Sequence, residues 1–231
     1  MTGGTTPAGW YPDPTSGGRQ RYWDGAAWTD HFAPEPPPVL VDIRAGRHDA
    51  KHLVATDDAI TIDEQPFPLT AIEGVTLTAV RQHLNGAYQG TNFTIVLRAG
   101  DRKASFLMGS GHKDVRLEEF RHAYGEVVHL LGGTVLPRLA AELAARMRAG
   151  EAITLGPAGA RVELDAAGFR LKKPLAKVVP WSVVTGTDIE GGRVWFMLPK
   201  KPGAEPKRHA LVGLEGENVV VLPHLLPLVR P

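Results

Sequence analysis

The chain has 231 residues, of which 43% are hydrophobic and 22% charged, a balance typical of a globular protein with one to three domains. Its formal net charge is only +1, so no overall positive charge favours nucleic acid, and we expect no nucleic-acid partner. It contains no cysteine, which excludes disulfides, thiolate metal sites and cysteine nucleophiles and fits a cytoplasmic protein.

The sequence contains no stretch that predicts export or a membrane span. Its start, MTGGTTPAG, lacks the basic residues and apolar run of a secretory signal. The most apolar stretch, NVVVLPHLLPLV, is interrupted by Pro223 and Pro227 and is shorter than the roughly 20 apolar residues that cross a bilayer. We therefore expect no transmembrane helix and a cytoplasmic location.

Residues 7–32 contain three tryptophans and two tyrosines, more large rings than so short a stretch can hide in a core. The turn signals TSGG and DG flank the strand-like RQRYW, which predicts a small β-meander. Because so small a module folds only weakly alone, its rings must pack on one another or dock on a partner. The candidate protein-binding or peptide-binding rings are Trp10, Tyr11, Tyr22, Trp23 and Trp28.

Through GWYPDP and RYWDGAAWT this segment resembles a short bacterial domain of unknown function. That family usually lies at an N-terminus, ahead of a proline-rich linker and a membrane segment or another module. The resemblance implies no known activity. The residues that carry it are Gly9, Trp10, Tyr11, Pro12, Asp13, Pro14, Arg21, Tyr22, Trp23, Asp24, Gly25, Trp28 and Thr29.

The same segment resembles a WW domain in its layout of an early tryptophan, a central aromatic pair and a later tryptophan followed by threonine. WW domains bind polyproline ligands on exposed aromatic rings. We hypothesise that Tyr22 or Trp23, together with Trp28, forms a groove for a proline-rich protein segment. The alternative is a structural microcore of the same rings. The adjacent PEPPP would be a competing ligand in the same chain or only a spacer.

A proline-rich linker, APEPPPV at residues 33–39, follows the aromatic segment and is predicted to be extended and stiff. After it come short runs rich in β-branched residues, among them AITID, GVTLTAV, NFTIVLRAG and RKASFLMG, which predict antiparallel strands. A helix is then predicted, with Asp114 as its N-cap and Gly132 and Gly133 at its end.

A second helix is predicted over residues 134–149, with Thr134 as its N-cap. Strand-like sequence resumes at ARVELDAAGFRLKK and continues through RVWFML and RHALVGL. A last short helix is expected around Glu217 to Leu222. Strands followed by a helix therefore occur twice along the chain.

An internal repeat supports this duplication. FPLTAIEGVTL, which begins at Phe67, aligns without a gap with VPWSVVTGTDI, which begins at Val179. Further on, KASFLMG from Lys103 aligns with KRHALVG from Lys207. Each match is weak alone, but together and in the same order they indicate a duplicated unit.

In GFRLKKPLAKVVPWSVV the second copy resembles the bacterial pleckstrin-homology-like domains. The resemblance implies about seven strands and a C-terminal helix, forming a curved sheet or barrel. The first copy departs from it, with Leu69 where the second has Trp181. The expected fold class is mainly β (α+β). The expected domains are the aromatic module at 7–32, the linker at 33–39, a first pleckstrin-homology-like domain at 40–133, a connecting helix at 134–149 and a second such domain at 150–231.

Two further motifs were weighed for chemistry. Glu-x-x-His occurs twice, as Glu119 with His122 and Glu126 with His129, but all four residues fall on one helical arc away from the apolar one, which favours a solvated face over a metal site. MGSGHKD, residues 108–114, lacks the spacing of a phosphate loop or a nucleophile elbow and predicts a strand-to-helix turn. We expect that the protein is not an enzyme and that it binds no metal and no cofactor.

Basic residues cluster twice in the second copy. They are Arg170, Lys172, Lys173 and Lys177 in RLKKPLAK, and Lys200, Lys201, Lys207 and Arg208 in PKKPGAEPKR. If these loops converge, they form a cationic rim suited to anionic lipid headgroups or acidic protein segments. The alternative is that the lysines only keep the surface soluble.

The expected function is that of a non-enzymatic adaptor or scaffold that binds other proteins. The alternative is peripheral binding to an anionic membrane through the basic loops of the second copy. The sequence leaves the oligomeric state open.

Overall fold

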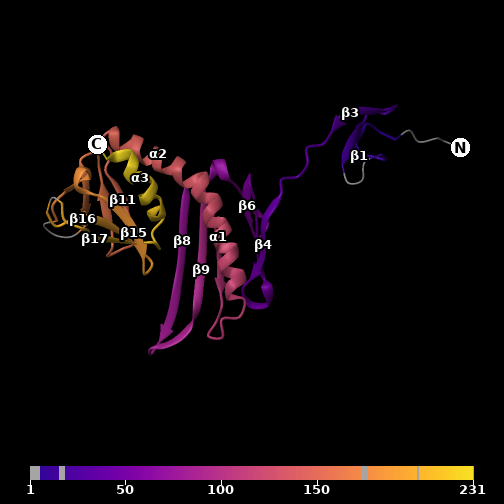
Figure 1. Cartoon of the computed structure of the whole chain (residues 1–231). Helices are drawn as coiled ribbons and strands as arrows, with labels where there is room; N and C mark the ends of the chain where they lie inside the picture. The colour runs from indigo at the N-terminus through magenta and orange to yellow at the C-terminus, as the bar shows by residue number, and fades with distance from the viewer. Residues whose placement is uncertain (1–5, 16–18, 173–175, 202, 231) are drawn as a thin grey trace. The chain divides into compact units, whose positions relative to one another are not determined.

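The computed structural model describes residues 6–15, 19–172, 176–201 and 203–230, and it is mainly β with three α-helices in those ranges (Figure 1). The expected fold class is confirmed. The chain divides into two compact units, Met1–Pro38 and Val39–Pro231. Each unit is described by itself.

The N-terminal unit is a three-stranded antiparallel meander, as predicted. Residues 16–18 of the predicted TSGG turn lie outside the described residues. Its strands are β1 (Gly9–Pro12), β2 (Gln20–Trp23) and β3 (Trp28–Phe32). The turn between β2 and β3 is held by the Asp24 carboxylate, which accepts hydrogen bonds from the backbone N–H groups of Ala26 and Ala27, each at 2.7 Å. These two bonds also lower the pKa of Asp24.

The first copy consists of a four-stranded sheet, a three-stranded sheet and a helix. Both sheets are antiparallel meanders in which each strand pairs with its neighbour in sequence. The strands are β4 (Val39–Ala45), β5 (Lys51–Thr56), β6 (Ala59–Ile62), β7 (Gln65–Pro68), β8 (Gly74–Leu84), β9 (Ala87–Ala99) and β10 (Arg102–Gly109), followed by α1 (Leu117–Gly133). Helix α1 packs against strands of both sheets (Figure 1).

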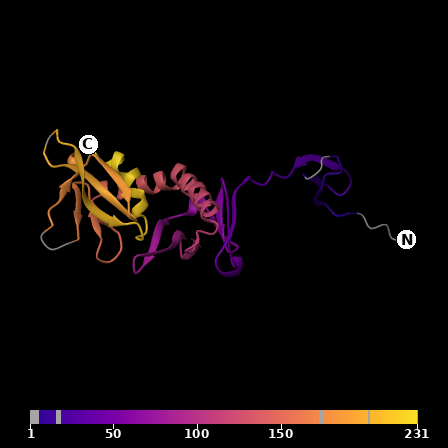
Figure 2. The same cartoon turned by 60° about the horizontal axis from the view of Figure 1, so that its bottom comes forward.

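The second copy repeats this order after the connecting helix α2 (Val135–Arg148). Figure 2 shows the second copy, in orange and yellow, beyond the helices. Its elements are β11 (Ile153–Leu155), β12 (Val162–Leu164), β13 (Gly168–Leu171), β14 (Val179–Pro180), β15 (Gly186–Glu190), β16 (Arg193–Pro199), β17 (Pro206–Gly213) and α3 (Leu222–Val229). Within the described ranges the strands form separate sheets and no closed barrel.

The repeat alignment places equivalent residues at equivalent points of the two copies. A single 3₁₀ turn joins the two sheets in each copy, at Leu69–Ala71 and Trp181–Val183. Leu69 and Trp181, which the alignment pairs, are both buried. In the second core Trp181 packs on Phe169 and Phe196, whose own rings stack with their centroids 4.1 Å apart.

The predicted helix ends need correction at two places. Asp114 is not an N-cap: α1 begins at Leu117, and the Asp114 carboxylate instead accepts hydrogen bonds from Ser110 and Tyr88. Within the range expected for the last helix there is a 3₁₀ turn at Val219–Val221. The α-helix itself is Leu222–Val229, because Pro223 suits the first turn of a helix. Thr134 does precede α2, but its hydroxyl donates to the carbonyl of Leu130.

Across the described residues, no one helix has the length and apolar character needed to cross a membrane. Only α1 and α2 taken together, with a 43° bend between them, have enough of both. Their apolar faces, which include Phe120, Val127 and Leu139, are buried in the core.

The two copies are joined by a contact at the start of β8. Asn218, which has a left-handed backbone (φ 62°), donates its N–H to the carbonyl of Val75 and accepts the N–H of Val75 on its side-chain oxygen. Its side-chain amide also donates to the carbonyl of Glu73 at 2.9 Å. Beside it, Arg98 donates to Glu217 and Glu73, at 2.9 and 2.7 Å, and the Glu217 bond in particular raises the pKa of Arg98.

Candidate functional site

The aromatic rings of the N-terminal unit lie on two opposite faces of its sheet. In the register of β1 and β2, Trp10 lies opposite Tyr22, and Tyr11 lies opposite Arg21. Because successive side chains of a strand point to opposite faces, Trp10 and Tyr22 share one face, and Tyr11 points to the other. The Trp10 and Tyr22 rings meet edge to face, with centroids 5.2 Å apart.

Tyr11, Trp23 and Trp28 form a small cluster on the second face. The Trp23 and Trp28 rings meet edge to face at 5.4 Å, and Tyr11 meets Trp28 at 6.4 Å. The polar ends of the cluster are also bonded: the Trp23 indole N–H donates to the carbonyl of Thr6, and the Tyr11 hydroxyl to that of Pro7. These three half-buried rings therefore serve as a microcore.

The Trp10 indole N–H has no hydrogen-bond partner among the described residues. Its ring, which contacts Tyr22, is 47% exposed and is the most exposed of the five candidates. The proposed pairing of Tyr22 with Trp28 is not formed, since these rings lie on opposite faces. Trp23 and Trp28 do contact each other, but their rings pack directly together and leave no groove between them. Of the five described rings, Trp10 is thus the exposed one, and it contacts the half-buried Tyr22.

A further aromatic residue, Phe32, was missed in the sequence. Its ring is 37% exposed and lies under the guanidinium groups of Arg19 and Arg21, 4.6 and 5.2 Å from the ring centre. Phe32 lies opposite Arg21 in the register and so shares the face of the microcore. Its place in alternation with Trp28 was the signal that could have found it.

The family comparison gives one match, at the N-terminal unit. Residues 8–40 match the family described as "Protein of unknown function (DUF2510)". The aromatic module is thus similar to a domain of unknown function. This match includes every candidate ring and the proline-rich linker, and it covers a small part of the chain. Among curated proteins no match to the chain is found.

Three of the candidate basic residues in the second copy are held in ion pairs. Arg170 and Lys172 both pair with Glu163, and Arg208 pairs with Asp188 and Glu190. The two cations on Glu163, Arg170 above all, lower the pKa of its carboxyl. These positive charges are therefore largely compensated.

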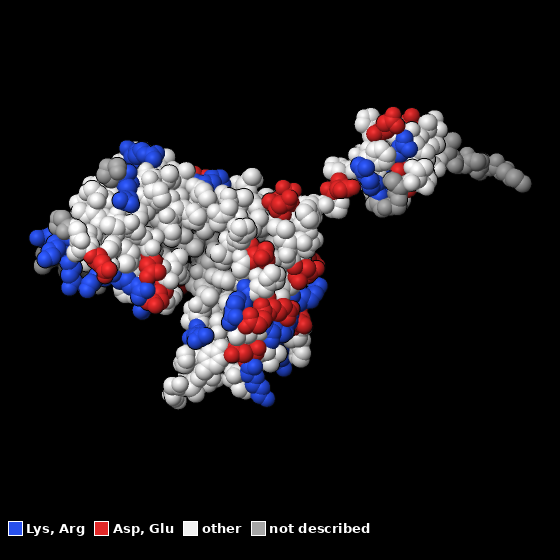
Figure 3. Space-filling model, viewed as in Figure 1, with Lys and Arg blue, Asp and Glu red and all other residues white. Residues whose placement is uncertain are grey.

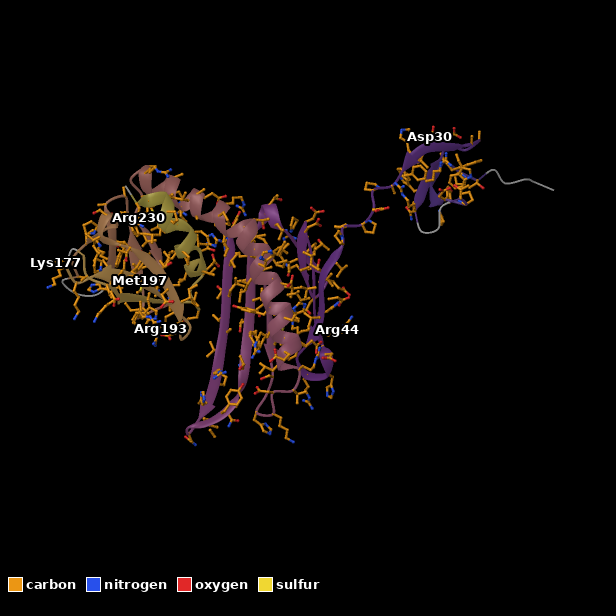
Figure 4. All side chains as sticks on the ribbon, viewed as in Figure 1. Asp30, Arg44, Lys177, Arg193, Met197 and Arg230 are labelled. Atoms are coloured by element: carbon orange, nitrogen blue, oxygen red, sulfur yellow. The ribbon has the colours of Figure 1, made fainter. Side chains whose placement is uncertain are left out.

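The four other described lysines of the two clusters have no ion pair with a described residue. Within the described ranges no carboxylate lies within 4.0 Å of Lys177, Lys200, Lys201 or Lys207, and all four are exposed. Figure 3 shows Lys and Arg side chains gathered on loops of the second copy, and Figure 4 labels Lys177 in one of them. Lys173 lies outside the described residues.

An apolar hollow of about 320 Å³ lies beside Lys177. Phe169 and Leu171 of β13, Val179 of β14 and Ala210 of β17 line it. A smaller adjoining hollow reaches Arg161 and Lys172. The second copy therefore combines an apolar floor with cations at its margin.

The MGSGHKD segment forms a turn that is held by side-chain hydrogen bonds. The Asp114 carboxylate accepts hydrogen bonds from Tyr88 at 2.6 Å and Ser110 at 2.8 Å, and these bonds lower its pKa. The Ser110 oxygen in turn accepts the N–H of Thr91 at 3.0 Å. The serine hydroxyl is thus engaged in holding the loop against β9.

The Glu-x-x-His pairs lie on α1 away from its buried face, as expected. Phe120, Ala123, Val127 and Leu131 are the buried residues of that helix. In the part of the chain that the structure describes, no three His, Asp or Glu side chains gather closely enough to bind a metal ion.

Proposed function

We propose that this chain is a non-enzymatic adaptor that binds other proteins, and that the exposed Trp10, together with the half-buried Tyr22 beside it, is its recognition surface. The observation that carries the proposal is the difference in packing and exposure among the five rings. Tyr11, Trp23 and Trp28 stabilise the module, whereas Trp10 leaves 47% of its surface in water. Tryptophan and tyrosine are among the residue types that contribute most to binding at protein interfaces.

The ligand class that fits this pair best is a proline-rich segment. Such a segment is already extended and loses little conformational freedom on binding, and its rings stack on flat aromatic surfaces. Trp10 offers such a surface at the edge strand β1. The proposed partner is therefore a protein with an exposed proline-rich stretch.

We assign the two copies, as part of the same proposal, to the pleckstrin-homology-like fold. The support is the shared order of a four-stranded meander, a three-stranded meander and a helix, with a buried residue at the same turn in each copy. We place the protein in the cytoplasm or at the periphery of a membrane.

Capture on an immobilised polyproline peptide tests the adaptor proposal. The intact chain should be retained, and Trp10→Ala should be lost. Phe32→Ala is the matched control, because Phe32 is similarly exposed but lies on the opposite face. Equal retention of Trp10→Ala and the intact chain would refute the proposed surface.

Peripheral binding to an anionic membrane is the second candidate function. Four exposed lysines of the second copy, three on loops and Lys207 in β17, favour it, because none of them has an ion pair among the described residues and Lys177 lines an apolar hollow. Each cation near an anionic bilayer contributes about 1 kcal/mol to binding. The apolar floor of the hollow would accept part of a lipid molecule.

A further inference from the structure

The two copies differ at two aligned positions of the core. Phe67 and Phe106 of the first copy are fully buried. The repeat alignment pairs Phe67 with Val179 and Phe106 with Ala210. In the second copy, two small side chains therefore replace two large rings.

The space that these replacements leave is open. Val179 and Ala210 both line the apolar hollow of about 320 Å³ beside Lys177. Trp181, which is larger than the aligned Leu69, contacts another lining residue, but it is not among the described residues that line the hollow. The greater volume of the tryptophan therefore does not fill this hollow.

The pairing of strands beside the hollow is also shorter than in the first copy. Strands β6 and β7 pair along their whole length, so Ile62 at the end of β6 has Gln65 as its partner. Strands β13 and β14 pair only at Gly168 and Phe169 of β13. Because β14 does not extend to Leu171 at the end of β13, the side chain of Leu171 becomes part of the wall of the hollow.

The charged side chains around the hollow are cationic. Lys177, labelled in Figure 4, lines the hollow and is exposed, and no described carboxylate lies within 4.0 Å of it. His209 lines both this hollow and the smaller adjoining one, which Arg161 and Lys172 also line. Among the described residues that line either hollow there is no Asp or Glu. A negatively charged group at this margin is therefore favoured.

The volume of the hollow fits one aliphatic chain. An apolar cavity of about 150 Å³ holds a benzene molecule, so about 320 Å³ holds a group roughly twice as large. A phospholipid carries two acyl chains, and both gain most by staying in the bilayer. A dissolved fatty acid, in contrast, combines a single chain with one carboxylate.

We propose that this hollow binds the acyl chain of a free medium-chain fatty acid, and that Lys177 pairs with the carboxylate at its margin. The chain covers the apolar side chains of Phe169, Leu171, Val179 and Ala210. His209 lines the same hollow and offers the carboxylate an imidazole N–H. Because the ligand is dissolved, the proposal requires neither a membrane nor the aromatic module, and it goes beyond both functions proposed above.

Calorimetric titration of the intact chain with decanoate, below the concentration at which decanoate forms micelles, tests this site. We expect saturable binding. Val179→Phe, which introduces the ring of the first copy, should weaken it by at least about tenfold, because the added ring displaces part of the acyl chain. The matched control is Val178→Phe, which should leave affinity unchanged, since Val178 is 41% exposed and does not line the hollow.

Two further comparisons test the charge at the margin. Lys177→Gln should weaken binding about fivefold at low salt, whereas Lys200→Gln, on another loop, should not change it. The cation decyltrimethylammonium, which has the same chain, should bind at least about tenfold more weakly than decanoate. Because Lys177 is exposed, these two comparisons decide the proposal even if Val179→Phe fails to fold.

Four results would overturn the proposal. These are no saturable binding of decanoate by the intact chain, equal affinity of Val179→Phe and Val178→Phe, equal binding of the cation and decanoate, or a dimeric chain that Val179→Phe makes monomeric, since a second molecule would then fill the hollow. Sedimentation with anionic vesicles separates the sources of the chain. If the protein binds vesicles but not decanoate, the membrane function stands and this proposal fails. Trp10→Ala should not alter the affinity for decanoate.

Discussion

Asn218 and Val75, which are 143 residues apart in sequence, exchange two hydrogen bonds of 2.8 and 2.9 Å. One partner is the edge of a strand in the first copy, and the other is a single residue that precedes the last helix of the second. The bonds mimic the pairing of two strands. They fix the second copy against the first at a defined register.

Asn218→Gly should lower the free energy of unfolding by about 1–3 kcal/mol, because it removes two side-chain hydrogen bonds while keeping the left-handed backbone accessible. Urea denaturation measures the change. Asn85→Gly is the matched control: Asn85 is also left-handed, lies in the β8–β9 turn and should change stability little. Equal stability of Asn218→Gly and the intact chain would contradict this role.

Gly74→Ala should destabilise the same contact. An added Cβ would lie 2.6 Å from Cδ of Glu217 and 2.9 Å from Cβ of Arg98, which predicts a loss of about 1–3 kcal/mol. Removing the Glu217 side chain as well should recover only part of this loss, since Arg98 stays. Gly125→Ala in α1, with open space around it, should instead stabilise by about 0.5–1 kcal/mol. Thermal unfolding of these three variants and the intact chain tests this, and a Gly74→Ala variant as stable as the intact chain would contradict the packing described.

The repeat and the strand order could be predicted because local patterns determine them. Short β-branched runs separated by turns mark each meander, and the aligned Leu69 and Trp181 mark equivalent core positions. The start of α1 could not be predicted from the sequence. Asp114 is a residue type that favours the N-cap position, but its carboxylate instead accepts a hydrogen bond from Tyr88, 26 residues earlier. Contacts between distant residues decide such cases.

The sequence predicted which residues belong to the candidate site, but not how they are arranged. The sequence indicates five rings, but the division into a microcore and the exposed Trp10 depends on the register in which Trp10 lies opposite Tyr22. Likewise, the basic clusters are visible in the sequence, but the pairing of Arg170 with Glu163 follows from the register of β12 and β13. The Asn218 contact left no local signal at all.

Acid should remove the stabilising effect of the Asp114 carboxylate. Its pKa in the folded chain is lowered by the hydrogen bonds from Tyr88 and Ser110, so the charged form favours folding above the ordinary pKa, and the benefit is lost as pH falls through the folded value. The difference in unfolding midpoint between the intact chain and Asp114→Asn should be constant above about pH 5 and shrink below about pH 4. A difference that does not change with pH would contradict this.

Membrane binding, if it occurs, should depend on the four exposed lysines of the second copy that have no ion pair with a described residue. Lys200→Gln together with Lys201→Gln should weaken binding to anionic vesicles at low salt, measured by sedimentation, roughly thirtyfold on the basis of about 1 kcal/mol for each of the two charges. Arg170→Gln should have a smaller effect, because Glu163 already compensates Arg170. Equal effects, or no sedimentation of the intact chain, would count against the membrane function.

The indole N–H signals in a two-dimensional NMR spectrum of the intact chain, recorded during titration with a polyproline peptide, test the central claim most directly. The chain has five tryptophans, and each contributes one signal that single substitutions assign. The account predicts that the Trp10 signal shifts and saturates, while those of Trp23 and Trp28 in the microcore stay nearly fixed. Shifts confined to Trp23 and Trp28, or no shift at millimolar peptide, would contradict it.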